Sequence, residues 1–130
     1  MRAQISMEFL VVFSIMLVLF LALFSVAGDL SRDMDVKKEK LSAMDIVDSL
    51  ALYIDLVHQA GDGASLNVSL APTIGMSGYN LSVANSSVLV FWKDSVYSSP
   101  ILSGSVQMNV SNYTDFFVRN VNGVVVLEGQ

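Results

Sequence analysis

Asparagines followed two positions later by a hydroxyl residue form the most frequent chemically suggestive pattern in this sequence. In Asn-x-Ser/Thr, the side-chain amide nitrogen is the acceptor for an N-linked oligosaccharide when the chain is exported and the site is exposed. Five of the seven asparagines stand in this pattern, namely Asn67, Asn80, Asn85, Asn109 and Asn112. We interpret them as possible N-glycosylation sites, with a polar, Asn- and Ser-rich β-surface without sugar as the alternative.

Groups for catalysis or metal binding are scarce. The absence of cysteine excludes disulfides, thiolate nucleophiles and Cys-based metal sites. His58 is the single histidine and stands near no nucleophile–base motif, which favours a surface helix residue over a catalyst. The acidic pairs Asp33-x-Asp35 and Asp45-x-x-Asp48 lack the ligand spacing and the glycine of an EF-hand. We therefore expect no enzyme, no catalytic residue, no metal and no cofactor.

The formal net charge of −5 argues against nucleic-acid binding, which needs a basic surface. Beyond Lys40 the only basic side chains are Lys93 and Arg119. An acidic surface of this kind is typical of an exposed, soluble domain.

An uncharged segment, Phe9–Ala27, predicts a single membrane span. About 20 apolar residues in a helix cover ~30 Å, the thickness of the hydrocarbon core of a bilayer. A secretory signal peptide would have a shorter apolar run that ends in a small-residue cleavage site. Ser25-Val26-Ala27-Gly28 is a poor match to such a site, so we expect the span to be retained.

The acidic residue directly before the span, Glu8, needs an explanation. A carboxylate costs about 2.5–3.5 kcal/mol at the centre of a membrane helix and less near the interface. Taken alone, Glu8 would be a side chain that reaches back to the headgroups. It belongs, however, to the string Gln4-x-Ser6-x-Glu8-Phe-Leu, which follows a short leader ending in Ala3.

This start resembles the class III signal peptide of archaeal type IV pilin-like proteins. The resemblance implies that a prepilin peptidase cuts between Ala3 and Gln4, and that the apolar helix is kept as the core of a filament. Gln4, Ser6 and Glu8 would form the processing and assembly motif. Glu8, then the fifth residue of the mature chain, would pair with the amino terminus of a neighbouring subunit, which compensates its charge. The later parts of the chain carry no motif of this family.

The basic residues around the span give a conflicting signal for topology. Four of them, Arg32, Lys37, Lys38 and Lys40, follow the span, and a positive-inside count would leave the C-terminal part in the cytoplasm. Acidic residues interleave these bases, and the sequons act only on exported chains. We therefore expect a single-pass membrane protein with a cytoplasmic N-terminus and an extracellular C-terminal domain.

Residues 29–60 have the pattern of an amphipathic helix. Between Asp29 and Gln59 there is neither glycine nor proline, and Gly61 is a plausible helix stop. Apolar residues recur at gaps of mostly three, four and seven, at Leu30, Met34, Leu41, Met44, Val47, Leu50, Ala51, Ile54 and Val57. We predict one helix from Gln4 to Ala60, whose second half buries this stripe against the following domain. We interpret the charged side of the helix, with Asp33, Lys37 and Lys40, as a solvated face, with a contact between subunits as the alternative.

The apolar period changes to two after Gly63. Alternation over 65–70, 79–83 and 105–110 predicts strands with one buried face, and the wholly apolar 88–92 predicts a central strand or one covered on both sides. Residues 84–87 and Asn122-Gly123 predict hairpin turns. On this basis we expect four to six strands in an antiparallel meander. Trp92, Phe116 and Phe117 are interpreted as core residues.

The predicted fold class is α+β, with one long N-terminal helix packed by a small antiparallel β-sheet domain, as in type IV pilins. We divide the chain into a leader (1–3), a transmembrane or filament-core helix (4–28), its amphipathic continuation (29–60) and a β-rich extracellular domain (61–130).

The leading hypothesis for function is a structural subunit of an archaeal type IV pilus-like surface filament used in attachment. Its expected partners are membrane lipid before assembly, the prepilin peptidase, and copies of itself or other pilins through the N-terminal helix. The alternatives are a minor pilin or tip component, an archaellin-like subunit, and a membrane-anchored extracellular binding domain that does not polymerise.

Overall fold

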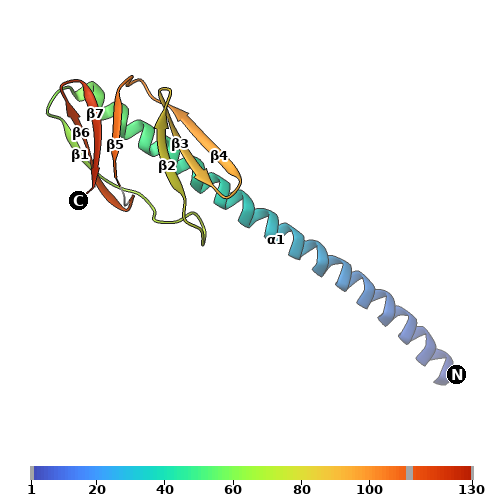
Figure 1. The fold of residues 1–130 in the computed structure, drawn as a ribbon. Coiled ribbons are helices and arrows are strands. Elements are labelled where there is room, and N and C mark those ends of the chain that lie inside the picture. The colour runs from blue at the N-terminus through green and yellow to red at the C-terminus, as the bar shows by residue number, and fades with distance from the viewer. Residues whose placement is uncertain (1, 111–112, 130) are drawn as a thin grey trace. The chain divides into compact units, whose positions relative to one another are not determined.

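The computed structural model describes residues 2–110 and 113–129, with side chains from Ser6 onward. In this part of the chain one helix, α1 (Arg2–Ala60), precedes seven strands (Figure 1). The strands are β1 (Ser65–Ser69), β2 (Asn80–Ala84), β3 (Ser87–Trp92), β4 (Ser95–Pro100), β5 (Val106–Asn109), β6 (Asp115–Val121) and β7 (Val124–Gly129). The predicted α+β class is confirmed, and α1 ends at Ala60 as expected. The chain divides into two compact units, one up to Lys38 and one from Glu39 onward.

The first unit is the N-terminal part of α1. Every described side chain from Ser6 to Lys38 is exposed. The Ser14 hydroxyl donates to the carbonyl of Leu10 at 2.7 Å, so this polar group is satisfied within the helix. Among the described residues, α1 is the one helix long and apolar enough to cross a membrane. The prediction of one possible membrane span near the N-terminus is therefore confirmed.

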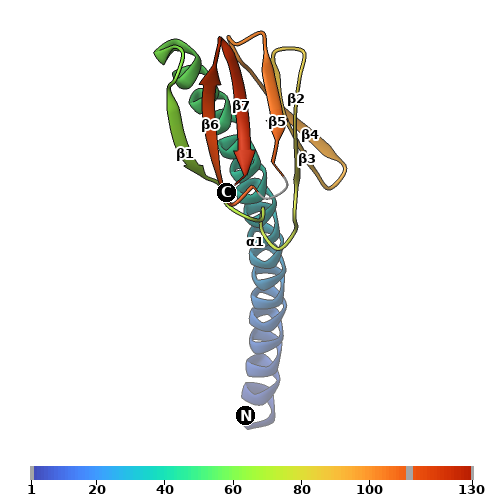
Figure 2. The same cartoon turned by 60° about the vertical axis from the view of Figure 1, so that its left-hand side comes forward.

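The second unit holds two sheets that pack on the C-terminal part of α1 (Figure 2). A three-stranded antiparallel sheet has the order β2-β3-β4, with β3 in the centre as predicted. A four-stranded sheet has the order β1-β6-β7-β5. In the second sheet β5 runs parallel to β7, whereas β6 is antiparallel to both β1 and β7.

The predicted antiparallel meander of four to six strands is wrong in two respects. The extra strand is β4, with the sequence Ser-Val-Tyr-Ser-Ser-Pro. Its polar residues obscure the apolar alternation by which a strand is recognised. It lies at a sheet edge, where a terminal proline is tolerated because no ladder bond depends on its missing N–H. The second difference is the parallel pairing of β5 with β7, which brings together segments that are not consecutive in the chain.

Two of the hairpins turn through residues with positive φ. Asn85 and Ser86 (φ 50° and 56°) join β2 to β3, and Asn122 and Gly123 (φ 54° and 84°) join β6 to β7. Positive φ at both central positions is the type I′ geometry, whose twist suits antiparallel strands. Both turns stand where the sequence predicted them.

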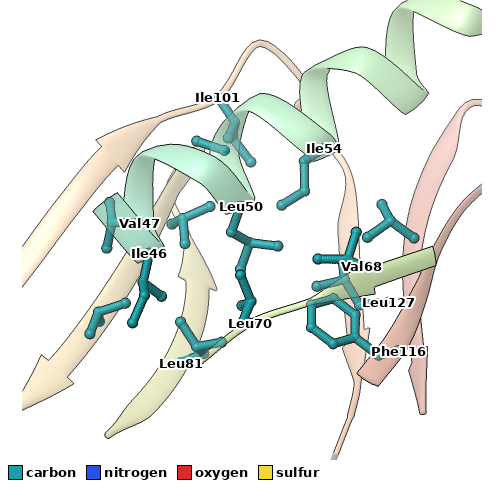
Figure 3. Close-up of a cluster of buried hydrophobic side chains, with 14 of the residues drawn as sticks. Ile46, Val47, Leu50, Ile54, Val68, Leu70, Leu81, Ile101, Phe116 and Leu127 are labelled. Carbon is teal, nitrogen blue, oxygen red and sulfur yellow. The ribbon is translucent and has the colours of Figure 1, made fainter. Parts of the chain in front are cut away.

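The core of the second unit lies between α1 and the inner faces of both sheets (Figure 3). The helix contributes a continuous stripe, made of Ala43, Ile46, Val47, Leu50, Ala51, Ile54 and Val57. Trp92 and Phe116 are buried in the same core, in agreement with the prediction, whereas Phe117 lies partly exposed on the outer face of its sheet. Trp92 is also the single tryptophan of the chain, so its fluorescence reports on folding of this unit.

The buried stripe of α1 differs from the predicted one over its first half. Leu30 and Met34 are exposed within the first unit, and in the second unit Leu41 is 65% and Met44 40% exposed. Leu41 and Leu50 are nine residues apart, about two and a half helical turns, which places them on opposite faces. Ala43 and Ile46 occupy the buried face instead.

Asn120 ties the C-terminal end of α1 to the sheet. This side chain is 2% exposed, and its amide nitrogen donates to the carbonyls of Val57 and His58 at 3.3 and 3.4 Å. Its Oδ1 accepts from the N–H of Gly123 at 3.0 Å. The last carbonyls of a helix have no partner within the helix, so an amide that reaches them offsets the cost of their burial.

We predict that Asn120→Ala lowers the free energy of unfolding of the second unit by about 2–3 kcal/mol, since the Val57 carbonyl and the Gly123 N–H lose the bonds that Asn120 makes, and the His58 carbonyl keeps only its bond from Gly61. The measurement is urea unfolding of the full chain in detergent, followed by Trp92 fluorescence. Gln107→Ala, at an exposed position of β5, is the control and should change stability by less than about 0.5 kcal/mol. Equal effects of the two substitutions would contradict the assigned role of Asn120.

Candidate functional site

The N-terminal motif is part of α1. Positions 3 and 4, between which cleavage is predicted, are helical, and their side chains lie outside the described ones. Ser6 and Glu8 are exposed. Being two residues apart on a helix, they point to different sides, so the structure does not bring these two side chains together.

The neighbours of Glu8 on its own helix are apolar. Met7, Val11 and Val12 lie beside it on the helix surface. Phe9, the next residue, stacks with Phe13, with ring centroids 6.1 Å apart. A carboxylate in such surroundings is well hydrated only while water or headgroups reach it, so burial against another apolar surface would require a positively charged partner.

The sequon asparagines lie on the surface of the second unit. Asn67 is on β1, Asn80 begins β2, Asn85 is in the β2–β3 turn and Asn109 ends β5, and all four are exposed. Asn112 lies outside the described residues. Asn120, which stands in no sequon, is buried. The polar-face placement predicted for Asn67, Asn80 and Asn109 agrees with the structure, and whether the sites carry sugar stays a prediction.

The strand register groups three of these asparagines into two cross-strand rows. On the four-stranded sheet, Asn67 pairs with Phe117, Phe117 with Glu128, and Glu128 with Asn109. On the three-stranded sheet, Asn80 pairs with Phe91. Sequence reasoning missed these neighbours because register between distant strands is not visible in local alternation.

An ion pair links α1 to the β3–β4 turn near the start of the second unit. The Lys93 ammonium lies 2.9 Å from the Glu39 carboxylate and 4.1 Å from the centre of the Trp92 ring. The Glu39 side chain also lies against Gly75, at a spot where any Cβ would collide with it. Because Lys93 is half exposed, we interpret these contacts as a local structural link between α1, the β1–β2 loop and the β3–β4 turn.

Tyr79 stabilises the loop that precedes β2. Its hydroxyl donates to the carbonyl of Ala71 at 2.6 Å, and its ring stacks on Tyr113 with centroids 5.9 Å apart. Burial, with a smaller contribution from Tyr113, raises the pKa of Tyr79 to about 12. The phenol therefore stays protonated, and remains a donor, throughout the physiological pH range.

The described residues bring together no group of three His, Asp or Glu side chains that could hold a metal ion. His58 sits in the last turn of α1, where its carbonyl accepts from the N–H of Gly61 and its Nδ1 is buried without a partner in the described part of the chain. The two acidic pairs singled out in the sequence lie along α1.

Comparisons with protein-family models, with curated proteins and with solved structures found no match. The pilin-like layout therefore rests on the chain itself, as a long apolar N-terminal helix followed by small β-sheets.

We predict that the mature protein begins at Gln4, because the motif that resembles a class III signal peptide places the scissile bond after Ala3. N-terminal peptide mapping of the protein from native cells measures this, with cyclised Gln4 counted as the same start. A mature chain that begins at Met1, or near Asp29, would rule out processing of the pilin kind.

We predict sugar on at least two of the five sequons, since the four that are described are exposed. Intact mass and glycopeptide mapping of the native protein measure occupancy at each asparagine. Asn122, which is exposed but stands in no sequon, is the internal control and should be unmodified. An unmodified native mass would be the contrary result.

Proposed function

We propose that this chain is a structural subunit of a type IV pilus-like surface filament of archaeal type, processed by a prepilin peptidase and used in attachment. The observation that carries the proposal is the combination of an exposed apolar helix with an acidic residue directly before it. The apolar helix makes the fibre core in this proposal, and the β-domains coat it.

The apolar segment must be covered by something other than its own chain. Its residues, from Phe9 to Ala27, are uncharged, and all are exposed. Leaving a large apolar side chain in water costs about 1.5–3 kcal/mol, so the whole segment would cost tens of kcal/mol. Membrane lipid supplies the cover before assembly, and neighbouring helices supply it in the filament.

Glu8 supports assembly over simple anchoring. A lone anchor does not need a carboxylate at this position, and its removal would make membrane insertion easier. Among packed helices the same carboxylate leaves water and needs compensation, which the free amino group of a neighbour at Gln4 would provide. Processing after Ala3 creates that amino group, so cleavage and pairing depend on each other.

The sequon surface supports an extracellular position for the β-domain. Export of this domain would put the N-terminus in the cytoplasm, the side on which the peptidase would act. In a filament the N-terminal helices would then lie inside and the glycosylated β-domains outside.

We predict that Glu8→Ala abolishes sheared surface filaments while processed, folded protein accumulates in the membrane. Glutamate and alanine are both good helix formers, so the substitution removes the charge without breaking the helix. Removing one member of a buried pair costs about 3–5 kcal/mol, and this loss recurs at each subunit added. Electron microscopy of sheared material, with mass-spectrometric identification of its subunits, measures the effect.

Two control variants make the result specific. Glu8→Gln should behave as Glu8→Ala, because it also lacks the charge. Val47→Asp buries a carboxylate in the core of the second unit and should instead reduce the amount of folded protein. Normal filaments from Glu8→Ala cells would contradict the pairing mechanism. Wild-type cells without any filament that contains this chain would favour a membrane-anchored binding domain.

A further inference from the structure

We propose that Phe91 and Phe117 are platforms on which the first sugars of the glycans at Asn80 and Asn67 stack. The inference rests on the glycosylation proposed above and adds a residue-level partner for the sugar. It is independent of whether the chain polymerises, because both pairs lie within the second unit.

The pair Asn80–Phe91 gives the strongest support for this proposal. The two residues are directly opposite each other on β2 and β3, so their side chains leave the same face of the sheet about 5 Å apart at Cβ. Their neighbours Leu81 and Val90 point into the core. Phe91 is 43% exposed, and on its other side it pairs with Val96, which is 57% exposed. An apolar strip therefore starts beside the sequon asparagine and runs across the outer face.

The pair Asn67–Phe117 repeats this arrangement on the other sheet. Asn67 is exposed on the edge strand β1, and Phe117 is its direct partner on β6. Phe116 and Val118 are buried, which shows that Phe117 faces outward with Asn67. Two sequon asparagines on different sheets thus have an outward phenylalanine as cross-strand neighbour.

The chemistry of a pyranose suits these positions. One face of a sugar ring presents several C–H groups, which carry small positive partial charges. The face of a phenyl ring is negative, so the two surfaces attract each other and exclude water from apolar area. An N-linked sugar is tethered to the neighbouring strand, so little freedom is lost when it settles on the ring.

The other described sequons provide a contrast within the same domain. Asn109 has Glu128 as its cross-strand partner, and Asn85 occupies a turn at φ 50°. Neither has a phenylalanine directly opposite. A sugar at these sites should be solvated and contribute little to stability.

The test is a double-mutant cycle on the full-length glycoprotein in detergent. Ser82→Ala removes the sequon of Asn80 while leaving the asparagine, and Phe91→Leu removes the ring. Thermal unfolding followed by Trp92 fluorescence compares the wild type, both single variants and the double variant. Ser87→Ala, which removes the Asn85 sequon and leaves the positive-φ turn residue unchanged, is the matched control. Glycopeptide mapping first establishes which asparagines carry sugar.

We expect Ser82→Ala to lower the unfolding midpoint by about 4 °C when Phe91 is present, and by less than about 1 °C in the Phe91→Leu background. Ser87→Ala should have the same small effect in both backgrounds. In a host without N-glycosylation, the dependence of Ser82→Ala on Phe91 should disappear. The same cycle with Ser69→Ala and Phe117→Leu tests the second pair.

Other outcomes overturn the inference and identify which premise failed. If Asn80 carries sugar and Ser82→Ala costs the same in both backgrounds, the platform is wrong and glycosylation stands. If Asn80 and Asn67 are both unmodified, the glycosylation premise itself fails at these sites. If Phe91→Leu changes self-association equally with and without the sugar, the strip binds a protein surface instead. Filament loss in Glu8→Ala is unaffected by any of these results.

Discussion

The whole molecule depends on one constraint, which is that a single helix must satisfy two different surroundings. Over residues 9–27 all side chains except Ser14 and Ser25 are apolar, and they occupy every side of the helix, so no orientation of this segment against a soluble domain could bury them all. From Ala43 to Val57 the buried apolar residues form one stripe, and two sheets cover it, whereas Leu52 and Leu56 stay exposed on the other side of the helix. The change in pattern decides where the β-domain packs, and it leaves the N-terminal segment to lipid or to other helices.

Without cysteine, the β-domain must be held to the helix by packing and hydrogen bonds. The hydrogen bonds concentrate at the helix end. Asn120 reaches the last carbonyls of α1, and the N–H of Asn122 donates to the Asp62 carboxylate at 2.7 Å. Gly61 and Gly63, at φ 90° and 83°, allow the chain to reverse there. The same few residues therefore terminate the helix, lead the chain into β1 and contact the β6–β7 hairpin.

Local signals in the sequence were sufficient for much of the fold. Periodicity identified the long helix and its end before Gly61, and turn chemistry identified the hairpins at Asn85 and Asn122. The same periodicity placed Leu41 in the core incorrectly, because a gap of seven from Met34 is compatible with a stripe that the domain does not cover.

Local sequence patterns did not predict which distant segments pair with each other. The parallel pairing of β5 with β7 and the cross-strand neighbours of Asn67 and Asn80 depend on the register of strands far apart in the chain. The sequence did not predict that Asn120 is buried, because its burial follows from tertiary packing. The one local difference from most of the other asparagines is that it stands in no sequon.

The position of the Asn67 sequon on an edge strand has a further physical consequence. A sheet edge exposes unpaired N–H and C=O groups, and an uncovered edge invites pairing with another chain. The two sheets approach each other along β2 and β5, which leaves β1 and β4 as the outer edges. β4 ends in Pro100, which cannot donate a ladder bond, whereas β1 has no proline and carries Asn67. With its first sugar on Phe117 as proposed, the rest of a glycan at Asn67 would hinder the approach of another strand to the edge that lacks proline. In the proposed filament, subunits would meet such edges at high local concentration, and a bulky, hydrated group there would restrict association to the helices.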